Sequence, residues 1–192
     1  MNYDLRLLPS VVARDDLASR SVRPQNPGVR RVQAAAGSIL FLALAPGVVA
    51  GLVPWLLTRW HSAGAPAWLQ ALGWISVAAG AAVLLEAFGR FVAEGVGTPA
   101  PAAPTEKLVV SGFYRYVRNP MYLAVASVIL GQAALLGRWL LVGYAFVFGA
   151  IVWSFVHWYE EPSLRRRFGA QYEQYIRVVP GWWPRRPRQP VG

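Results

Sequence analysis

Four long stretches of this chain contain no Asp, Glu, Lys or Arg, and they limit the folds available to it. They lie between Arg31 and Arg59, Arg59 and Glu86, Arg118 and Arg138, and Arg138 and Glu160. The stretches hold 27, 26, 19 and 21 residues, and about 20 mostly apolar residues suffice for a membrane helix. They are continuously apolar rather than alternating, which favours helices over barrel strands. Only 15% of the 192 residues are charged, against about 25% in soluble domains, so the chain is expected to be an integral membrane protein.

We expect an all-α fold with about four transmembrane helices. Their expected bounds are 34–57, 67–92, 120–137 and 139–158. Pro46 and Pro54 should kink the first helix, because proline removes a backbone donor. The last two helices should form a tight antiparallel hairpin, since only Gly137 and Arg138 separate them.

The basic residues are distributed unevenly along the chain. Seventeen of the nineteen Lys and Arg residues lie in the N-terminal segment, the central loop with its edges, or the tail, against Arg59 and Arg138 between them. Positive residues concentrate on the cytoplasmic side of membrane proteins. We therefore expect both termini and the central loop in the cytoplasm. This one-sided distribution explains most of the formal charge of +10 without a nucleic-acid partner. Attraction to the anionic headgroups of the lipid bilayer is the better reading of the basic tail.

The chain divides into three parts on this pattern. Residues 1–31 form a polar cytoplasmic segment, residues 32–184 a single membrane domain, and residues 185–192 a basic tail. The first apolar stretch starts too late and is too long for a signal peptide. The absence of cysteine excludes disulfides and a cysteine nucleophile.

The first polar segment of interest is GFYRYVRNPMY, residues 112–122, which leads into the third expected helix. Pro120 in the first helical turn is a normal start signal. Two readings of its polar residues stay open. In the first, they anchor the chain at the membrane interface as an aromatic belt with positive charge. In the second, they form part of a functional site. The residues concerned are Tyr114, Arg115, Tyr116, Arg118 and Tyr122.

The second polar segment is HWYEEPSLRRRFGAQYEQYIR, residues 157–177. Glu160 and Glu161 lie where the fourth expected helix leaves the membrane, at the end of the helix dipole that disfavours negative charge. An unpaired charge there is costly, so a positive group should compensate them. The candidates are Arg118, one of Arg165–Arg167, or a cationic ligand. A simple salt bridge closing the hairpin against the tail is the plainer alternative.

Residues 162–177 are predicted to form an amphipathic interfacial helix. Leu164, Phe168, Tyr172 and Tyr175 recur at helical spacing opposite polar residues, which is typical of a helix lying on a membrane face. We expect Gly169 to weaken this helix without breaking it.

Glu86 and His157 are the remaining polar candidates near lipid. Glu86 lies within the second expected span, with Arg90 one turn later. It is either functional or paired with Arg90 at the cytoplasmic edge. A single His near two Glu is thin support for a metal site, so no metal is expected.

The two polar segments together resemble the isoprenylcysteine carboxyl methyltransferase and phospholipid methyltransferase superfamily. The matching residues are GFYRYVRNPMYL, a helical hairpin, and then EEPSLRRRFGAQYEQYIRVVPGWWP. The resemblance covers roughly Thr98 to Pro184, and the first two expected helices share only hydrophobicity with the family.

The resemblance implies a membrane-embedded methyltransferase that uses S-adenosylmethionine and acts on a lipophilic acceptor. By position, it implies that Glu160, Glu161 and Arg118 are catalytic. It also implies that the cofactor is bound by Arg118, Asn119, Pro120, Tyr122, Glu160, Glu161, Arg165, Tyr172 and Tyr175, with Arg177 in the same closing tail. Asn119 stands where better-known members have His, and an Asn cannot shuttle protons.

The chemistry of these residue types is compatible with that cofactor. Acidic residues suit its cationic part, Arg118 can grip its carboxylate in a bidentate manner, and aromatic rings can face the sulfonium. An amine acceptor would need a base such as Glu160 or Glu161, whereas a carboxylate acceptor would need none. The acceptor stays open among an isoprenylcysteine-like carboxylate, a phospholipid amine, a small thiol and a quinone-like lipid. A membrane reductase of the sterol-reductase type that uses NADPH, and a non-enzymatic membrane scaffold, are the alternative functions.

Overall fold

The computed structural model describes residues 44–94 and 108–185, and within those ranges every regular element is a helix. The predicted all-α class is therefore confirmed for the described part of the chain. An apolar helix at Leu44–Thr58 comes first, and it includes a π-helical turn, η4 (Val48–Leu52), followed by α2 (Val53–Thr58). The elements that follow are α3 (Ala67–Glu94), the 3-10 turn η5 (Gly112–Arg115), α4 (Pro120–Leu136), α5 (Trp139–Phe155), the π turn η6 (Val156–Glu160), α6 (Glu161–Phe168) and α7 (Ala170–Val178).

Two of the described helices are long and apolar enough to cross a membrane, judged by length and composition alone. They are Ala67–Arg90 and the continuous helical segment Trp139–Phe168. The helices Leu44–Thr58 and Pro120–Leu136 are apolar but shorter, and residues 34–43 of the first expected span lie outside the described residues. The helices expected at 67–92, 120–137 and 139–158 are present, while the number of four membrane spans stays a prediction.

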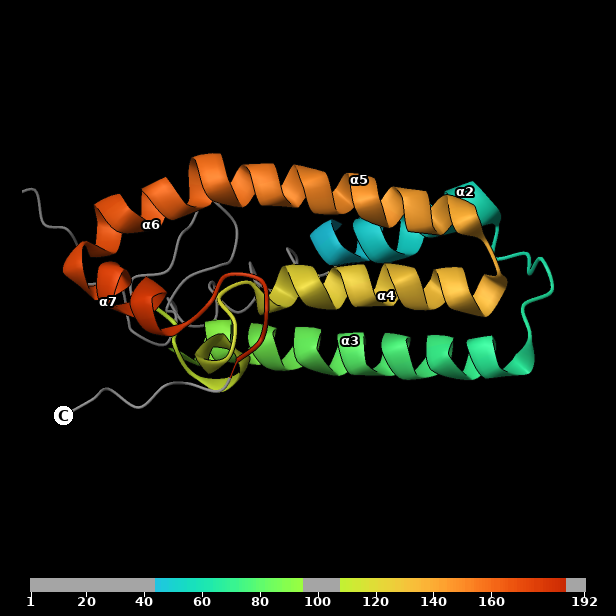
Figure 1. Cartoon of the computed structure of the whole chain (residues 1–192), viewed down its shortest axis with the longest axis horizontal. Helices are drawn as coiled ribbons and strands as arrows, with labels where there is room; N and C mark the ends of the chain where they lie inside the picture. Colours follow the sequence, from blue (N-terminus) through green and yellow to red (C-terminus); the bar gives the residue numbers. More distant parts are fainter. Residues whose placement is uncertain (1–43, 95–107, 186–192) are drawn as a thin grey trace, which may run out of the picture.

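Helices α3 and α4 pack closely along their length and lie side by side in Figure 1. Glycines make the contact possible: a Cβ atom on Gly73 would lie 2.7 Å from the backbone oxygen of Gly131, and one on Gly80 would lie 2.8 Å from that of Ala124. The Ser76 hydroxyl also donates to the Ser127 carbonyl at 2.9 Å, and the Ser127 hydroxyl donates back to the Ser76 carbonyl at 3.1 Å. Small residues and interhelical hydrogen bonds of this kind hold membrane helices together.

The predicted hairpin between α4 and α5 is confirmed. Gly137 caps α4 with a φ of 64°, a left-handed conformation that glycine adopts without steric cost. The chain then turns at Arg138 into α5, whose Leu141 is fully buried.

The helix after the hairpin does not end where the sequence pattern placed its end. We expected a span ending at residue 158 and a separate interfacial helix from 162, but α5 continues through η6 into α6 without a break. Pro162 lies inside this continuous helix, directly after the π-helical turn η6, and local π adjustments of this kind accommodate the backbone donor that proline lacks.

The expectation that one helix covers residues 162–177 is wrong at Gly169. This glycine has φ 49° and ψ −124°, and it ends α6 and begins α7. Such a conformation is essentially restricted to glycine, so the residue acts as a corner rather than as a weak point. The two helices turn back over one end of the bundle (Figure 1).

Several predictions fall on residues outside the described ranges. They concern the N-terminal segment 1–31, most of the central loop, and the basic tail beyond Arg185. The kink expected from Pro46 and Pro54 also stays a prediction, although a π-helical turn does lie between these prolines.

Candidate functional site

Chain segments far apart in the sequence meet at the end of the bundle where α6 and α7 lie (Figure 1). They are the last turns of α3, the turn η5 with the start of α4, and the segment from η6 to α7. The polar residues singled out from both sequence segments lie here. The structure therefore brings together side chains that are more than forty positions apart, such as Arg118 and Glu161.

Arg118 is the centre of the polar contacts. Its Nη1 lies 2.8 Å from Oε1 of Glu161 and donates to the hydroxyl of Tyr172 at 3.2 Å. Its backbone amide donates to the carbonyl of Pro180 at 2.9 Å, which fixes the residue against the C-terminal segment. Its Nε atom is buried and has no hydrogen-bond partner among the described residues. The guanidinium is thus held in place with one donor unsatisfied.

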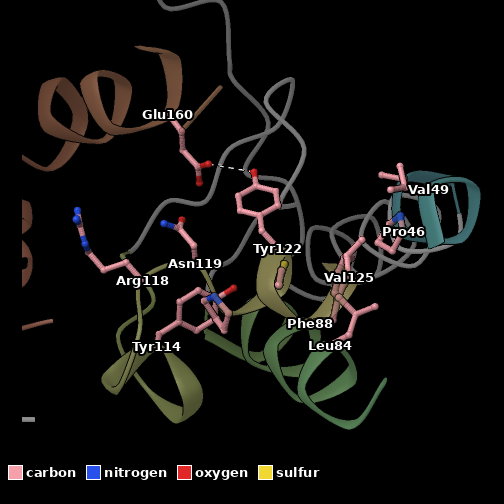
Figure 2. A pocket seen from close by; sticks show the side chains of 13 residues that line it. Pro46, Val49, Leu84, Phe88, Tyr114, Arg118, Asn119, Tyr122, Val125 and Glu160 are labelled. Atoms are coloured by element: carbon pink, nitrogen blue, oxygen red, sulfur yellow. Dashed lines mark hydrogen bonds between the residues drawn. The ribbon is translucent and has the colours of Figure 1, made fainter. Parts of the chain in front are cut away.

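The two adjacent glutamates have different partners. Glu161 pairs with Arg118, whereas Glu160 accepts a hydrogen bond of 3.0 Å from the hydroxyl of Tyr122 (Figure 2). The described residues place no cation in an ion pair with Glu160. One acid of the pair is therefore neutralised and the other is bound only by a neutral donor.

Two cavities meet at this cluster. The smaller has a volume of about 70 Å³, or about 490 Å³ when its opening to solvent is included. The larger has a volume of about 130 Å³, or about 680 Å³ with its opening. Four residues line both cavities, namely Tyr114, Arg118, Asn119 and Glu160.

The two cavities differ in the residues that complete them. Glu161, Tyr172 and Tyr175 line only the smaller one, together with Leu108, Val109, Val156 and Leu164. The larger one is completed by Tyr122 and by apolar residues, namely Ala45, Pro46, Val49, Leu84, Phe88, Pro120, Met121 and Val125. Figure 2 shows Glu160, Arg118 and Asn119 on one side and Val49, Leu84 and Val125 on the other. A polar chamber therefore adjoins an apolar one.

Tyrosines form much of the polar chamber, and burial dominates their acid-base behaviour. The pKa of Tyr114 is raised well above its ordinary value, first because burial disfavours the phenolate. Burial likewise raises the pKa of Tyr172, although the charge of Arg118 opposes the shift. Burial also raises the pKa of Tyr175, whose hydroxyl donates to the Tyr114 carbonyl at 2.7 Å. All three hydroxyls therefore stay protonated at neutral pH; that of Tyr175 donates, whereas that of Tyr172 accepts from Arg118.

The C-terminal segment closes the site through backbone contacts. The side-chain amide of Asn119 donates to the carbonyl of Gly181 at 3.1 Å and makes no cap hydrogen bond to α4. A Cβ atom on Gly181 would lie 3.1 Å from Nη2 of Arg118. Asn119 therefore joins α4 to the segment after α7.

Some predicted site residues lie elsewhere. Arg165 is half-exposed, lies 3.6 Å from Glu173 and lines neither cavity. Arg177 is exposed and also lines neither. Glu86 forms an ion pair with Arg90 at 2.9 Å, which is one of the two alternatives predicted for it. The ring of His157 stacks on that of Trp153.

Sequence reasoning missed part of the cavity walls. The anchoring reading is wrong for Tyr114, which is 7% exposed and packs with Ala87 and Val109, while Tyr116 is exposed. Leu84 and Phe88, unlike Tyr114, were not singled out in the sequence. Their spacing of four residues on α3 places them on one face of the helix, and that was the available signal.

The charges and shape of the site define the ligands that it suits. An Arg–Glu pair beside a second acid complements a zwitterion with an additional positive charge. The adjoining apolar chamber suits a hydrocarbon group. Within the described residues, no group of three His, Cys, Asp or Glu side chains is placed to hold a metal ion.

The chain belongs to the phospholipid methyltransferase family, because the family model matches residues 68–171, more than half of the sequence. It is also similar to the protein-S-isoprenylcysteine O-methyltransferase of Schizosaccharomyces pombe. The two are 36% identical over 80 residues, which make up 40% of this chain and 33% of that relative. The match thus spans about a third of the relative's length. No solved structure matches the chain.

Proposed function

We propose that this chain is a membrane-embedded methyltransferase that uses S-adenosylmethionine and methylates a lipophilic acceptor. The observation that carries the proposal is the Arg118–Glu161 pair, at 2.8 Å, in the wall of a polar chamber that adjoins an apolar one. Membership of the family and similarity to an O-methyltransferase support the reaction class.

The residues of the polar chamber fit the amino-acid end of this cofactor. The carboxylate of the cofactor can take the place of Glu161 and bind Arg118. Its ammonium can take the place of Arg118 and bind Glu161. The Nε of Arg118 has no partner among the described residues and is a further donor, next to Nη2 on another edge of the guanidinium. The enclosed volume of about 70 Å³ holds several water-sized groups, and the nucleoside requires the open part of the chamber.

The remaining chemistry divides between the cofactor and the chain. When bound, S-adenosylmethionine supplies an electrophilic methyl group on a positively charged sulfur. Glu160 provides a compensating negative charge where the two cavities meet, and Tyr122 orients its carboxylate. The apolar wall excludes water, which strengthens these electrostatic interactions and prevents hydrolysis of the methyl donor.

The larger cavity is the proposed acceptor site. Residues from three helices line it, Val49 before α2, Leu84 of α3 and Val125 of α4, and all three are apolar. A hydrocarbon chain therefore fits, with its reactive group directed toward Glu160. For an amine acceptor Glu160 would act as the base, while a carboxylate or a deprotonated thiol would need none.

We propose that the site end of the bundle and both termini lie on the cytoplasmic side and that the chain passes through the membrane several times. The support is the distribution of charge, because Arg115, Arg118, Arg165–Arg167 and Arg177 all lie near this end. Arg59 and Arg138 lie at the opposite end, beside the α4–α5 hairpin. The positive-inside rule favours this orientation.

Calorimetry with S-adenosylhomocysteine on the detergent-purified full chain tests the proposal. We expect binding that is lost in Glu160→Ala and Arg118→Ala and kept in Arg165→Ala, the matched arginine outside both cavities. NADPH should not bind, and binding of NADPH instead would favour a reductase. Transfer of labelled methyl groups into a total membrane extract would then identify the acceptor. Retained binding in both site variants would rule out the assigned residues.

A further inference from the structure

A groove of about 630 Å³ lies next to the site and shares only Pro120 with the larger cavity. Its walls come from α3, α4 and the segment between them, and Pro184 and Arg185 of the C-terminal segment also line it. The short segment before α4 separates the groove from the site. Tyr116 and Val117 of this segment line the groove, whereas Arg118 lines the cavities.

The body of the groove is apolar and follows two helices that are themselves apolar. Ala79 and Val83 contribute from α3, and Leu123 and Ala124 from α4. From Pro120 to Ser127 the wall covers seven residue steps of helix, or about 10 Å at about 1.5 Å per residue. A wall of that length can contact part of an acyl chain that lies along the side of the bundle.

The lining of the groove includes a single basic side chain and no acid. The backbone amide of Arg185 donates to the carbonyl of Tyr116 at 3.0 Å, which holds the residue against the segment before α4. None of the residues that line the groove is Asp or Glu. Among the described residues, the Arg185 side chain has no ion-pair partner.

We propose that this groove binds an anionic phospholipid, with an acyl chain along α3 and α4 and the phosphate against Arg185. The charge at the mouth selects the headgroup, because a guanidinium without an acidic partner attracts net negative charge. The apolar walls select a chain-bearing ligand over free phosphate. This binding site is separate from the cavities and does not depend on the proposed reaction.

Native mass spectrometry of the full chain from mixed micelles tests the proposal. The micelles contain equal amounts of dioleoyl phosphatidylglycerol and dioleoyl phosphatidylcholine, which share their acyl chains and differ in net charge. We expect retained phosphatidylglycerol to exceed phosphatidylcholine by about fivefold, which is the effect of one arginine at an anionic headgroup. Arg185→Gln should reduce the ratio to about one. Arg115→Gln, a nearby exposed arginine outside the groove, should leave it unchanged.

Two further experiments distinguish the proposed phospholipid from free phosphate and from a second copy of the chain. Ala79→Phe fills the apolar part from an exposed position on α3, so it should abolish lipid retention without unfolding the chain. Sodium phosphate at matched concentration should not raise the thermal unfolding midpoint, whereas phosphatidylglycerol should. Equal retention of both lipids, an equal loss in Arg115→Gln, or stabilisation by phosphate alone would overturn the proposal. So would a dimer that Ala79→Phe dissociates and that phosphatidylglycerol leaves unaffected.

Discussion

Arg118 illustrates how much a single residue's partners depend on the folded chain. Its type and position named it as one of several possible counterions for the glutamate pair, and the structure gives it Glu161 and Tyr172. The other named arginines, Arg165–Arg167, are exposed. Sequence supplied the set of candidates because charge near lipid must be compensated. It could not rank them, because the turn through η6 and the break at Gly169 decide which face each glutamate presents.

The hydrogen bond from Arg118 to Tyr172 can be removed by deleting a single oxygen atom. Tyr172→Phe removes the hydroxyl that accepts from Nη1 of Arg118 and keeps the buried ring. Loss of one such hydrogen bond costs about 0.5–1.5 kcal/mol, so we expect S-adenosylhomocysteine to bind roughly 2- to 10-fold more weakly by calorimetry. Tyr116→Phe is the control, because Tyr116 is exposed and lines neither cavity. Equal effects in the two variants would contradict the assigned contact.

Tyr175 predicts how stability depends on alkaline pH. Its folded pKa is raised by burial above the unfolded value near 10, so its contribution is fully present below about pH 10 and is lost as the pH rises toward the folded pKa. Ionisation would also remove the proton donated to the Tyr114 carbonyl. We expect the thermal unfolding midpoint to fall above pH 10, and less steeply in Tyr175→Phe. An unchanged slope in the variant would contradict this role.

At the scale of elements, the helices were predictable, whereas only one of the joints between them was. The charge-free runs place α3, α4 and α5 because lipid requires a continuous apolar helix over such lengths. Gly137 was readable as a turn since two residues must join antiparallel helices. Gly169 was misread because a lone glycine is compatible with a helix, and only the packing of Tyr172 and Tyr175 into the site requires its corner. The unbroken run from α5 to α6 was missed for a similar reason. A proline such as Pro162 usually marks the start of a new helix, but it can also lie inside a continuous helix next to a π-helical turn.

The close packing of α3 against α4 requires glycine at the contact, and a substitution of Gly73 tests this. In Gly73→Ala the new Cβ would lie 2.7 Å from the Gly131 carbonyl oxygen and 2.8 Å from the Leu135 amide nitrogen. Overpacking against backbone costs about 1–3 kcal/mol, so we expect a lower midpoint in denaturant unfolding. Gly143→Ala on α5 is the matched control, because nothing lies within 4 Å of its Cβ position. Its stability should be unchanged or higher by up to about 1 kcal/mol. Equal stability of the two variants would contradict the close packing.

At the scale of the whole molecule, the family match and the two cavities coincide only in part. The match covers residues 68–171, which include α3 to α6 and the residues of both polar segments up to Gln171. Val49 and Pro46 of the larger cavity lie before it, and Tyr172 and Tyr175 of the smaller one follow it. The first helix therefore supplies part of the proposed acceptor wall from outside the matched region. Variation there is expected to change the acceptor more than the methyl donor.

The proposed function depends most on the Arg118–Glu161 pair, which would hold the amino-acid group of the cofactor. The most direct test compares two ligands by calorimetry: S-adenosylhomocysteine, and 5′-methylthioadenosine, which lacks the amino-acid end. We predict that Arg118→Gln and Glu161→Gln each weaken S-adenosylhomocysteine by at least about tenfold, as expected when a charged contact is lost, and leave methylthioadenosine within about twofold. An equal change for both ligands, or unchanged binding of S-adenosylhomocysteine in the two variants, would contradict the account.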